Sequence, residues 1–212
     1  MRLAGIGVPD AAAAWEAIGC TVVDGAVPFA NGALLLGVEG LLVDDVPAAL
    51  TVPAGFEGVT LAVGPRRSAA DHPSGAYELD HLVLLTDALE RTSAAVHAAL
   101  GLECRRIRDT GTVRQAFHRF DDVDGPGVDR VRGCIIEIVE SDRVAATTMM
   151  GMVVIVADLF GLAERLGPDV LSAPKPAVQP GRHISTVRRD VGLGTAVAFM
   201  SPDGPRSDTS GD

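Results

Sequence analysis

The sequence predicts an α+β fold built from repeated β-α-β-β-β units. Three segments begin with an apolar run of strand type, which is followed by an Asp, a stretch rich in Ala and Leu, and a Gly. Asp is favoured where a helix begins, and Gly is favoured just past its end. Further strand-like segments follow each predicted helix, so the same plan recurs along the chain.

The first unit opens with the strand Leu3–Val8. Asp10 is the expected cap of a helix at Ala11–Ile18, and Gly19 ends it. The strands that follow are predicted at Thr21–Val23, Ala33–Leu36 and Val59–Val63. We expect residues 1–64 to form a degenerate N-terminal module, and residues 65–76, with Pro65 and Pro73, to form a linker.

The second and third units are more regular and are predicted to form one domain at 77–202, with modules at 77–141 and 149–202. In the second unit, strand Leu79–Leu85 leads to Asp87, a helix at Ala88–Leu100, and strands at Glu103–Arg108, Thr112–Phe120 and Cys134–Val139. In the third unit, strand Gly151–Ala157 leads to Asp158, a helix at Leu159–Leu166, and strands at Ile184–Arg188 and Thr195–Met200. Residues 203–212 contain almost no apolar side chain, so we expect a disordered tail.

Composition narrows the functional class. Hydrophobic residues make up 47% of the 212 residues and charged residues 22%, which is typical of a globular protein with a substantial core. The formal net charge of −10 argues against a nucleic-acid-binding protein, because phosphate recognition requires a basic surface. Three cysteines are too few for a disulfide framework, and no apolar run is long enough for a membrane span, so we expect a cytoplasmic, soluble protein.

Glu137 and His81 are the strongest pointers to a site. Each lies on a predicted strand among apolar residues, where Glu137 shares a face with Ile135 and Val139. A carboxylate in such surroundings is costly to bury unless it meets a cation, a metal ion or a ligand donor. Glu137 is therefore predicted to face a pocket, and the alternative is a buried ion pair with an arginine.

The repeated plan, with His on the first strand of a unit and Glu on its last, resembles the vicinal oxygen chelate superfamily, which includes glyoxalase I, bleomycin-resistance proteins and extradiol dioxygenases. The resemblance covers residues 77–202 and is carried by the strings ELDHLVLLTD, GCIIEIVES, GMVVIVAD and QPGRHISTVRRDVGLGTAVAFMSP. It implies that two modules pair into a curled mixed sheet that forms a cup around a small-molecule site. The N-terminal module would be a third, degenerate copy, which we expect to pack across the open side of the pair or against a second chain, and a homodimer is one outcome.

The resemblance also implies a divalent metal ion, such as Zn, Ni, Mn or Fe, held by residues on the first and last strands of both modules. His81 and Glu137 occupy two of these four positions. Spacing before the helix places Met152 at the position equivalent to His81, and Ala198 falls opposite Glu137 in the other module. Neither is a ligand for such an ion, so the metal site is predicted to be incomplete unless His118 or Gln115 supplies a third ligand.

Further candidates for ligand binding lie on two other strands. Arg182, Thr186 and Arg188 share a face, and the two guanidinium groups could clamp a carboxylate or phosphate; a solvent-exposed edge strand is the alternative. Arg114, Gln115 and Phe117 combine polar groups with an aromatic ring that could flank a ligand, and Met152 is a further candidate.

Two functions follow from these residues. The first is a glyoxalase-like protein that binds a small organic, anionic molecule in the cup with an incomplete metal site. The alternative is a lyase, isomerase or dioxygenase that depends on a divalent metal ion held by His81 and Glu137, in which Glu137 could also act as a catalytic base. The sequence leaves open whether the protein is an enzyme.

Overall fold

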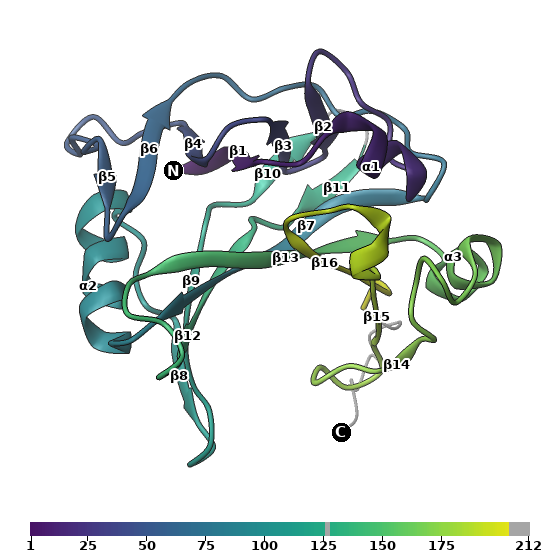
Figure 1. The fold of residues 1–212 in the computed structure, drawn as a ribbon. Coiled ribbons are helices and arrows are strands. Elements are labelled where there is room, and N and C mark those ends of the chain that lie inside the picture. Colours follow the sequence, from purple (N-terminus) through teal and green to yellow (C-terminus); the bar gives the residue numbers. More distant parts are fainter. Residues whose placement is uncertain (126–127, 204–212) are drawn as a thin grey trace, which may run out of the picture.

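The computed structural model describes residues 1–125 and 128–203, and their strands form two large sheets and one small hairpin (Figure 1). The larger sheet, here called the cup sheet, has the strand order β14-β15-β16-β13-β7-β12-β9-β8. The other, here called the N-terminal sheet, has the order β2-β3-β1-β4-β6-β5. The hairpin consists of β10 (Val123–Gly125) and β11 (Val128–Val131).

The cup sheet contains the two predicted modules. The first comprises β7 (Ala76–Thr86), α2 (Leu89–Leu100), β8 (Arg106–Asp109), β9 (Arg114–Arg119) and β12 (Ile135–Glu140). The second comprises β13 (Thr148–Val156), α3 (Leu159–Leu166), β14 (Lys175–Pro176), β15 (His183–Thr186) and β16 (Ala196–Met200), with a short 3-10 helix at Arg189–Val191.

The strand pairing of the two modules is the same. The first strand of each module pairs in parallel with its last strand, and the two first strands, β7 and β13, pair antiparallel at the centre. Both ends of the sheet bend in the same direction, with α2 and α3 on the outside (Figure 1). The α+β fold with two modules paired into a curled mixed sheet, predicted from the sequence, is confirmed.

The N-terminal sheet repeats this arrangement in shortened form. Its strands are β1 (Arg2–Val8), β2 (Ala26–Phe29), β3 (Gly32–Leu36), β4 (Gly40–Asp44), β5 (Gly55–Phe56) and β6 (Val59–Val63). The helix α1 (Ala12–Ala17) follows β1. Strand β1 is parallel to β3, β4 is parallel to β6, and β1 and β4 pair antiparallel at the centre. Residues 1–64 thus contain two short half-units, rather than the single degenerate module that we predicted.

One strand prediction for this segment was wrong, and another was right in its bounds but not in its place in the unit. The predicted strand at Thr21–Val23 is absent, since Val23 forms only an isolated bridge with Ala26. The predicted strand Val59–Val63 exists, but it pairs with β4 and belongs to the second half-unit. The periodicity of a short apolar run does not specify its partner, so a strand can be located without its neighbours being known.

The predicted helix caps hold for one helix of three. Asp158 caps α3 by accepting a hydrogen bond from the Gly161 N–H at 2.9 Å. Asp87 does not cap α2, which has Ala88 at that position, and its carboxylate pairs with Arg91 instead. Asp10 is buried and accepts hydrogen bonds from the backbone of Gly194 and Thr195, so it joins the two sheets rather than capping α1.

The N-terminal sheet covers the convex side of the cup sheet, opposite the open side of the cup (Figure 1). Leu3 and Ile6 of β1 belong to the same buried cluster as Leu79 and Leu84 of β7, which makes the two sheets one continuous core. The expectation that this part of the chain packs across the open side of the cup was therefore wrong, and the homodimer stays a prediction. The apolar convex face of β7 and its neighbours provides a large surface that would otherwise be exposed to water.

Asn31, in the turn between β2 and β3, braces the first half of β7. Its Nδ2 donates to the carbonyl oxygens of Leu79 and Arg132, both at 2.8 Å, and the Leu79 N–H donates to its Oδ1 at 2.9 Å. The Ala30 N–H donates to the carbonyl oxygen of Tyr77. On this side of β7 the neighbouring strand β12 begins only opposite His81, so the turn satisfies backbone groups that no strand reaches.

The helices in the described part of the chain are too short or too polar to cross a bilayer. Of the predicted tail 203–212, Asp203 is described, and the rest lies outside the described residues.

Asn31→Ala should lower the free energy of unfolding by about 2–4 kcal/mol, because it leaves buried backbone groups of β7 without hydrogen-bond partners. Urea denaturation followed by circular dichroism measures the loss. The control is Val63→Ala, at an exposed residue of β6, which should change stability by less than about 0.5 kcal/mol. Equal stability of the two variants would show that β7 does not depend on this turn.

Candidate functional site

The concave side of the cup sheet encloses a cavity of about 330 Å³. Strands from both modules line it, with β7, β8, β9 and β12 on one side and β14, β15 and β16 on the other. The lining residues are His81, Arg108, Gln115, Phe117, Glu137, Lys175, Ala177, Val178, Gln179, Ile184, Thr186 and Met200. This volume lies at the small end of the range for ligand pockets, which is roughly 300–1,000 Å³.

A β-bulge in β7 determines how His81 enters this cavity. His81 lies opposite Val153 and Leu79 lies opposite the next residue, Val154, so Asp80 is an extra residue in β7. Neighbouring residues of a regular strand point to opposite faces, but a bulge re-aims them. Asp80 and His81 are thereby close enough for the Nδ1 of His81 to lie 2.7 Å from the Oδ2 of Asp80.

Asp80 is held from a second direction by Arg182, whose Nη1 donates to Asp80 Oδ1 at 2.9 Å. Both side chains are largely buried, with 12% and 7% of their surfaces exposed. Burial raises the pKa of Asp80, but the hydrogen bonds and charges of His81 and Arg182 outweigh burial and leave the pKa below its ordinary value of 3.8. The carboxylate is therefore ionised at neutral pH, and it orients the imidazole ring.

Glu137 lies beside the other nitrogen of the same ring. The distance from His81 Nε2 to Glu137 Oε2 is 3.4 Å, which is close enough for an ion pair when the imidazole is protonated. The other oxygen, Oε1, accepts from Gln115 Nε2, and Gln115 Oε1 in turn accepts from Arg108 Nη1 at 3.3 Å. The side chains of Arg182, Asp80, His81, Glu137, Gln115 and Arg108 thus form a row of neighbouring polar groups across one half of the cup.

The other half of the cup is mostly apolar, although Lys175, Gln179 and Thr186 also line it. Val153, Ile155, Ala198 and Met200 form a small buried cluster, against which Ala177 and Ile184 pack. The difference between the halves arises because the second module lacks polar residues at the positions that correspond to His81 and Glu137.

The strand pairing identifies those corresponding positions. His81 lies beside Ile135 of its parallel partner, and Glu137 is two residues further along that strand. In the other module, Gly151 lies beside Ala196, and Ala198 is two residues further along. Gly151, and not Met152, therefore corresponds to His81, because α2 begins one residue later after its Asp than α3 does. A Cβ on Gly151 would overlap the carbonyl oxygen of Ala196, so this position accepts no side chain.

These residues do not fit the four-ligand metal site that the family resemblance implies. His81 and Glu137 provide two donors, and Gly151 and Ala198 provide none at the symmetric positions. Across residues 1–125 and 128–203, no group of three or more His, Cys, Asp or Glu side chains is placed to hold a metal ion. Structural and catalytic zinc sites usually have three or four protein ligands.

Five of the residues that the sequence singled out line the cavity: His81, Gln115, Phe117, Glu137 and Thr186. Met152 does not, since it points to the convex side and is buried in the main core. His118 also lies on the convex side, where it contacts the Ser93 hydroxyl and the Leu102 carbonyl oxygen, so it cannot serve as a third ligand.

The three predicted arginines lie outside the cavity lining. Arg114 pairs with Glu90 and Glu140. Arg182 pairs with Asp80, as described above, and Arg188 donates to the carbonyl oxygen of Pro168. The clamp of Arg182 and Arg188 around an anion is thus not formed, and none of the three arginines neutralises Glu137.

Three residues that border the site were missed in the sequence. Asp80 was missed because strict alternation places it on the face opposite His81, and only the bulge reverses this. Arg108 and Lys175 were missed because they lie on short strands at the two edges of the cup sheet. The adjacent pair Asp80-His81 was the available signal, since a carboxylate beside a histidine often fixes its orientation.

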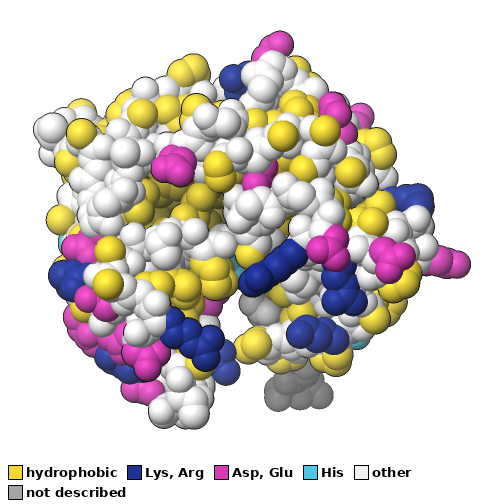
Figure 2. All heavy atoms as spheres, viewed as in Figure 1, with side chains coloured by type: hydrophobic (Ala, Val, Ile, Leu, Met, Phe, Trp, Pro, Cys, Tyr) yellow, Lys and Arg dark blue, Asp and Glu magenta, His cyan; other side chains and the backbone are white. Residues whose placement is uncertain are grey.

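Basic side chains flank the open side of the cup. Lys and Arg side chains gather on both sides of the gap between the two halves of the molecule (Figure 2). Arg108 of β8 and Lys175 of β14 reach the cavity itself. In a chain of net charge −10, this concentration of positive charge makes the rim of the cup differ from the protein as a whole.

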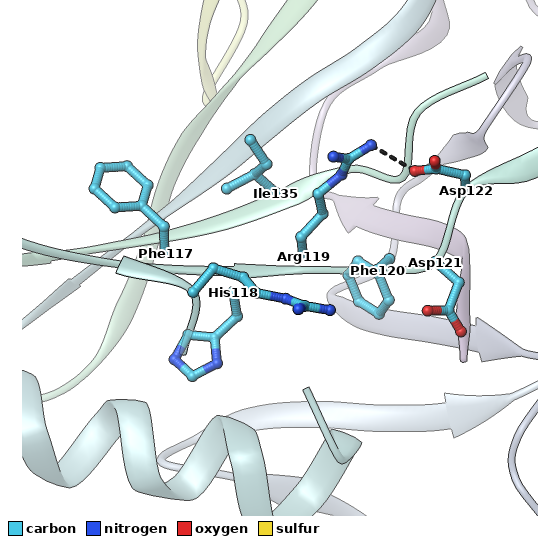
Figure 3. A pocket seen from close by; sticks show the side chains of 8 residues that line it. Phe117, His118, Arg119, Phe120, Asp121, Asp122 and Ile135 are labelled. Atoms are coloured by element: carbon cyan, nitrogen blue, oxygen red, sulfur yellow. Dashed lines mark hydrogen bonds and ion pairs between the residues drawn. The ribbon is translucent and has the colours of Figure 1, made fainter. Parts of the chain in front are cut away.

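A second hollow, of about 470 Å³, lies at the outer edge of β9 (Figure 3). Phe117 and Arg119 lie on one side of the strand with Ile135, whereas His118 and Phe120 lie on the other side. Arg119 is paired with Asp122. The residues that line this hollow thus lie on both sides of β9, and the labelled side chains do not converge on one point. This distinguishes the hollow from the cup.

A third cavity, of about 240 Å³, adjoins the Asp80–Arg182 pair and is also lined by Glu78, Arg132 and Asp203. Burial, and next the negative charge of Asp80, raise the pKa of Glu78 to about 7. Glu78 is therefore a group near the site that changes its charge around neutral pH.

The chain matches no protein-family model and no curated protein. Solved structures that are similar to it include a methylmalonyl-CoA epimerase from Streptomyces coelicolor in complex with 2-nitronate-propionyl-CoA, with 16% identity and a TM-score of 0.47 over 59% of this chain and 97% of that one. Another is the methylmalonyl-CoA epimerase from Mycobacterium tuberculosis, with 15% identity and a TM-score of 0.47 over 62% of this chain and 91% of that one. A hypothetical protein from Bacillus halodurans has 13% identity and a TM-score of 0.45 over 60% and 95%.

These similarities concern the fold alone. The strand pairing of residues 76–200 by itself shows two paired β-α-β-β-β modules, which is the arrangement that the resemblance implied.

Glu78→Gln should stabilise the protein at pH 8 by about 1–2 kcal/mol and have little effect near pH 4.5. A carboxyl whose folded pKa is near 7 rather than 4.5 takes up a proton on folding, so it lowers stability progressively as pH rises from 4.5 to 7. Urea denaturation of both proteins at several pH values measures the difference. Glu164→Gln, on an exposed position of α3, is the control, and an equal pH dependence in wild type and Glu78→Gln would contradict the assignment.

Proposed function

We propose that this protein binds a small organic acid in the cup between the two modules. The observation that carries the proposal is the composition of the 330 Å³ cavity, in which Arg108 and Lys175 enter from opposite edges of one sheet. A carboxylate between them would gain charge-assisted hydrogen bonds from both sides.

The remaining lining supports a ligand that has an apolar part as well. Ile184 and Met200 line one side, and Phe117 adds a ring on the other. Small-molecule sites commonly combine a mostly apolar wall with a few well-placed polar groups. Gln115 and Glu137 would then fix the orientation of the ligand, because their hydrogen bond holds both side chains in place.

A second candidate is a lyase, isomerase or dioxygenase that depends on a divalent ion. It is favoured by the 3.4 Å distance between His81 Nε2 and Glu137 Oε2, since two ligands of a tetrahedral ion at about 2.1 Å each are separated by roughly this distance. Asp80 would hold the far nitrogen of the ring, as carboxylates do for histidine ligands. The glycine and alanine at the symmetric positions weigh against it, so metal-independent binding is the function that we favour.

The double variant Arg108→Met, Lys175→Met should bind small carboxylates at least about tenfold more weakly than wild type, because two charged partners of the anion are lost. Isothermal titration with a panel of short aliphatic and aromatic carboxylates measures the affinity. Arg143→Met, in the exposed loop between β12 and β13, removes a similar charge away from the cup and should leave the affinity unchanged. An equal loss of affinity in both variants would show that the effect comes from the net charge of the protein, and it would contradict binding between Arg108 and Lys175.

The metal content of the purified protein separates the two candidates. We expect well below one equivalent of zinc, nickel, manganese or iron by elemental mass spectrometry, because two ligands hold such ions weakly. Near-stoichiometric metal that is lost in the His81→Ala, Glu137→Ala double variant would instead establish the metal-dependent alternative.

A further inference from the structure

We propose that the ligand of the cup is an elongated molecule with a second acid group at its far end, and that this second group binds at Arg105 and Arg106, beside the hollow at the outer edge of β9. This inference rests on the proposed function and makes its ligand class narrower. Two features carry it. The cup continues into the hollow, and neither arginine has an acidic partner among the described residues.

The cup and the 470 Å³ hollow share one face of the cup sheet. Phe117 lines both of them. Ile135, which lies opposite Arg119 in the pairing of β12 with β9, lines the hollow on the same side of β9 as Phe117 and Arg119 (Figure 3). Because Phe117 also lines the cup, this side is the concave one. The concave face therefore continues from the cup across Phe117 and Ile135 into the hollow.

Three arginines follow the same path along the neighbouring strand. Arg108 and Arg106 of β8 lie directly opposite Gln115 and Phe117 of β9. Directly opposite residues of antiparallel strands share a face, so both arginines lie on the concave side with these two residues of the cup. Arg105, whose N–H donates to the carbonyl oxygen of Phe117, precedes β8 and lines the hollow. The guanidinium groups thus lead from the cup to the hollow.

The side chains of Arg105 and Arg106 are exposed, and neither forms a hydrogen bond or an ion pair in the part of the chain that the structure describes. The carboxylates that line the hollow are already paired, Asp121 with the amino-terminal group and Asp122 with Arg119. A guanidinium group is charged at any pH that the protein meets, and it presents paired donors to an acid group. An acid group at this position would therefore meet two available cations, whatever the protonation state of the groups inside the cup.

The spacing along β8 sets the length of the ligand. A strand rises by about 3.4 Å per residue, so Arg106 lies about 7 Å and Arg105 about 10 Å beyond Arg108. The first acid group would lie in the cup at Arg108 and Lys175, as proposed above, and the second at the hollow. Phe117 lies between them, so the connecting part of the ligand is apolar. These features describe a linear dicarboxylic acid of medium length, or the same chain ended by a phosphate-type group.

A chain-length series tests this inference. Succinate, adipate, suberate and sebacate are compared by isothermal titration with butanoate, hexanoate, octanoate and decanoate. Within each pair, a methyl group replaces the second carboxylate and the rest of the chain is the same. A further probe, 7-phosphonoheptanoate, has a phosphonate in place of the second carboxylate of suberate. A gain in affinity from either terminal group supports the inference, and the comparison between them identifies the group that the arginines prefer.

We expect suberate or sebacate to bind about tenfold or more tightly than its monocarboxylate, because a charge-assisted hydrogen bond at the far end contributes at least that factor. Succinate is too short to reach from Arg108 to Arg105, so its gain over butanoate should be smaller.

The double variant Arg105→Met, Arg106→Met should remove the gain, so that the two members of each long pair bind with about equal affinity. Both positions are exposed, so the variant should retain the fold. The matched control is the double variant Arg67→Met, Arg143→Met. It removes two exposed arginines that line neither the cup nor the hollow, and it should retain the gain.

The possible failures are distinguishable. If monocarboxylates bind but a second acid group improves the affinity at no chain length, the inference is wrong and the proposed function stands. If no probe binds, both are wrong. If the gain persists without Arg105 and Arg106, or is lost equally in the control variant, the second acid group does not bind at these two arginines and the inference is overturned.

Discussion

The β-bulge at Asp80 is the feature on which the geometry of the cup depends. Without the extra residue, Asp80 and His81 would point to opposite faces of β7, and the imidazole would have no fixed orientation. The bulge lies where β7 has lost one neighbouring strand, and Asn31 supplies the missing hydrogen bonds there. Its stability is thus provided by a different sheet from the one that contains the site. The N-terminal sheet therefore both stabilises the bulge and covers the apolar convex side of the cup sheet.

The two modules have the same strand order but different chemistry. In one, the positions that face the cavity carry His81 and Glu137, and in the other the corresponding positions carry Gly151 and Ala198. The result is a cup with one polar and one apolar half, which suits a ligand with two unlike ends better than it suits a symmetrically bound ion. Gly151 reinforces this difference, since its close approach to Ala196 leaves no room for a ligating side chain.

The sequence was sufficient for the modules and for half of the site. The strands and helices of residues 77–202 follow from apolar runs and helix signals, and the alternation along β9 and β12 correctly directed Gln115, Phe117 and Glu137 to one face. The features that depend on how the strands pair were not predicted. Asp80 reaches the site only because of a β-bulge. Met152 was wrongly matched to His81, one residue away from Gly151, because the two helices begin at different distances from their Asp residues. Arg108 and Lys175 line the same cavity only because the sheet curls. The division of residues 1–64 into two half-units was not predicted, because the short strands β4 and β5 were missed and the partners of β6 are set by tertiary contacts.

The bracing of β7 by Asn31 also has a kinetic consequence. The hydrogen bonds around the bulge join residues that are 48 positions apart in one direction, and Arg182 joins Asp80 across 102 positions. Contacts of such large sequence separation form slowly, because the chain loses entropy before they are made. Neither module alone contains all the segments that orient His81. The candidate site should therefore be among the last parts of the protein to order during folding, after the two sheets have packed together.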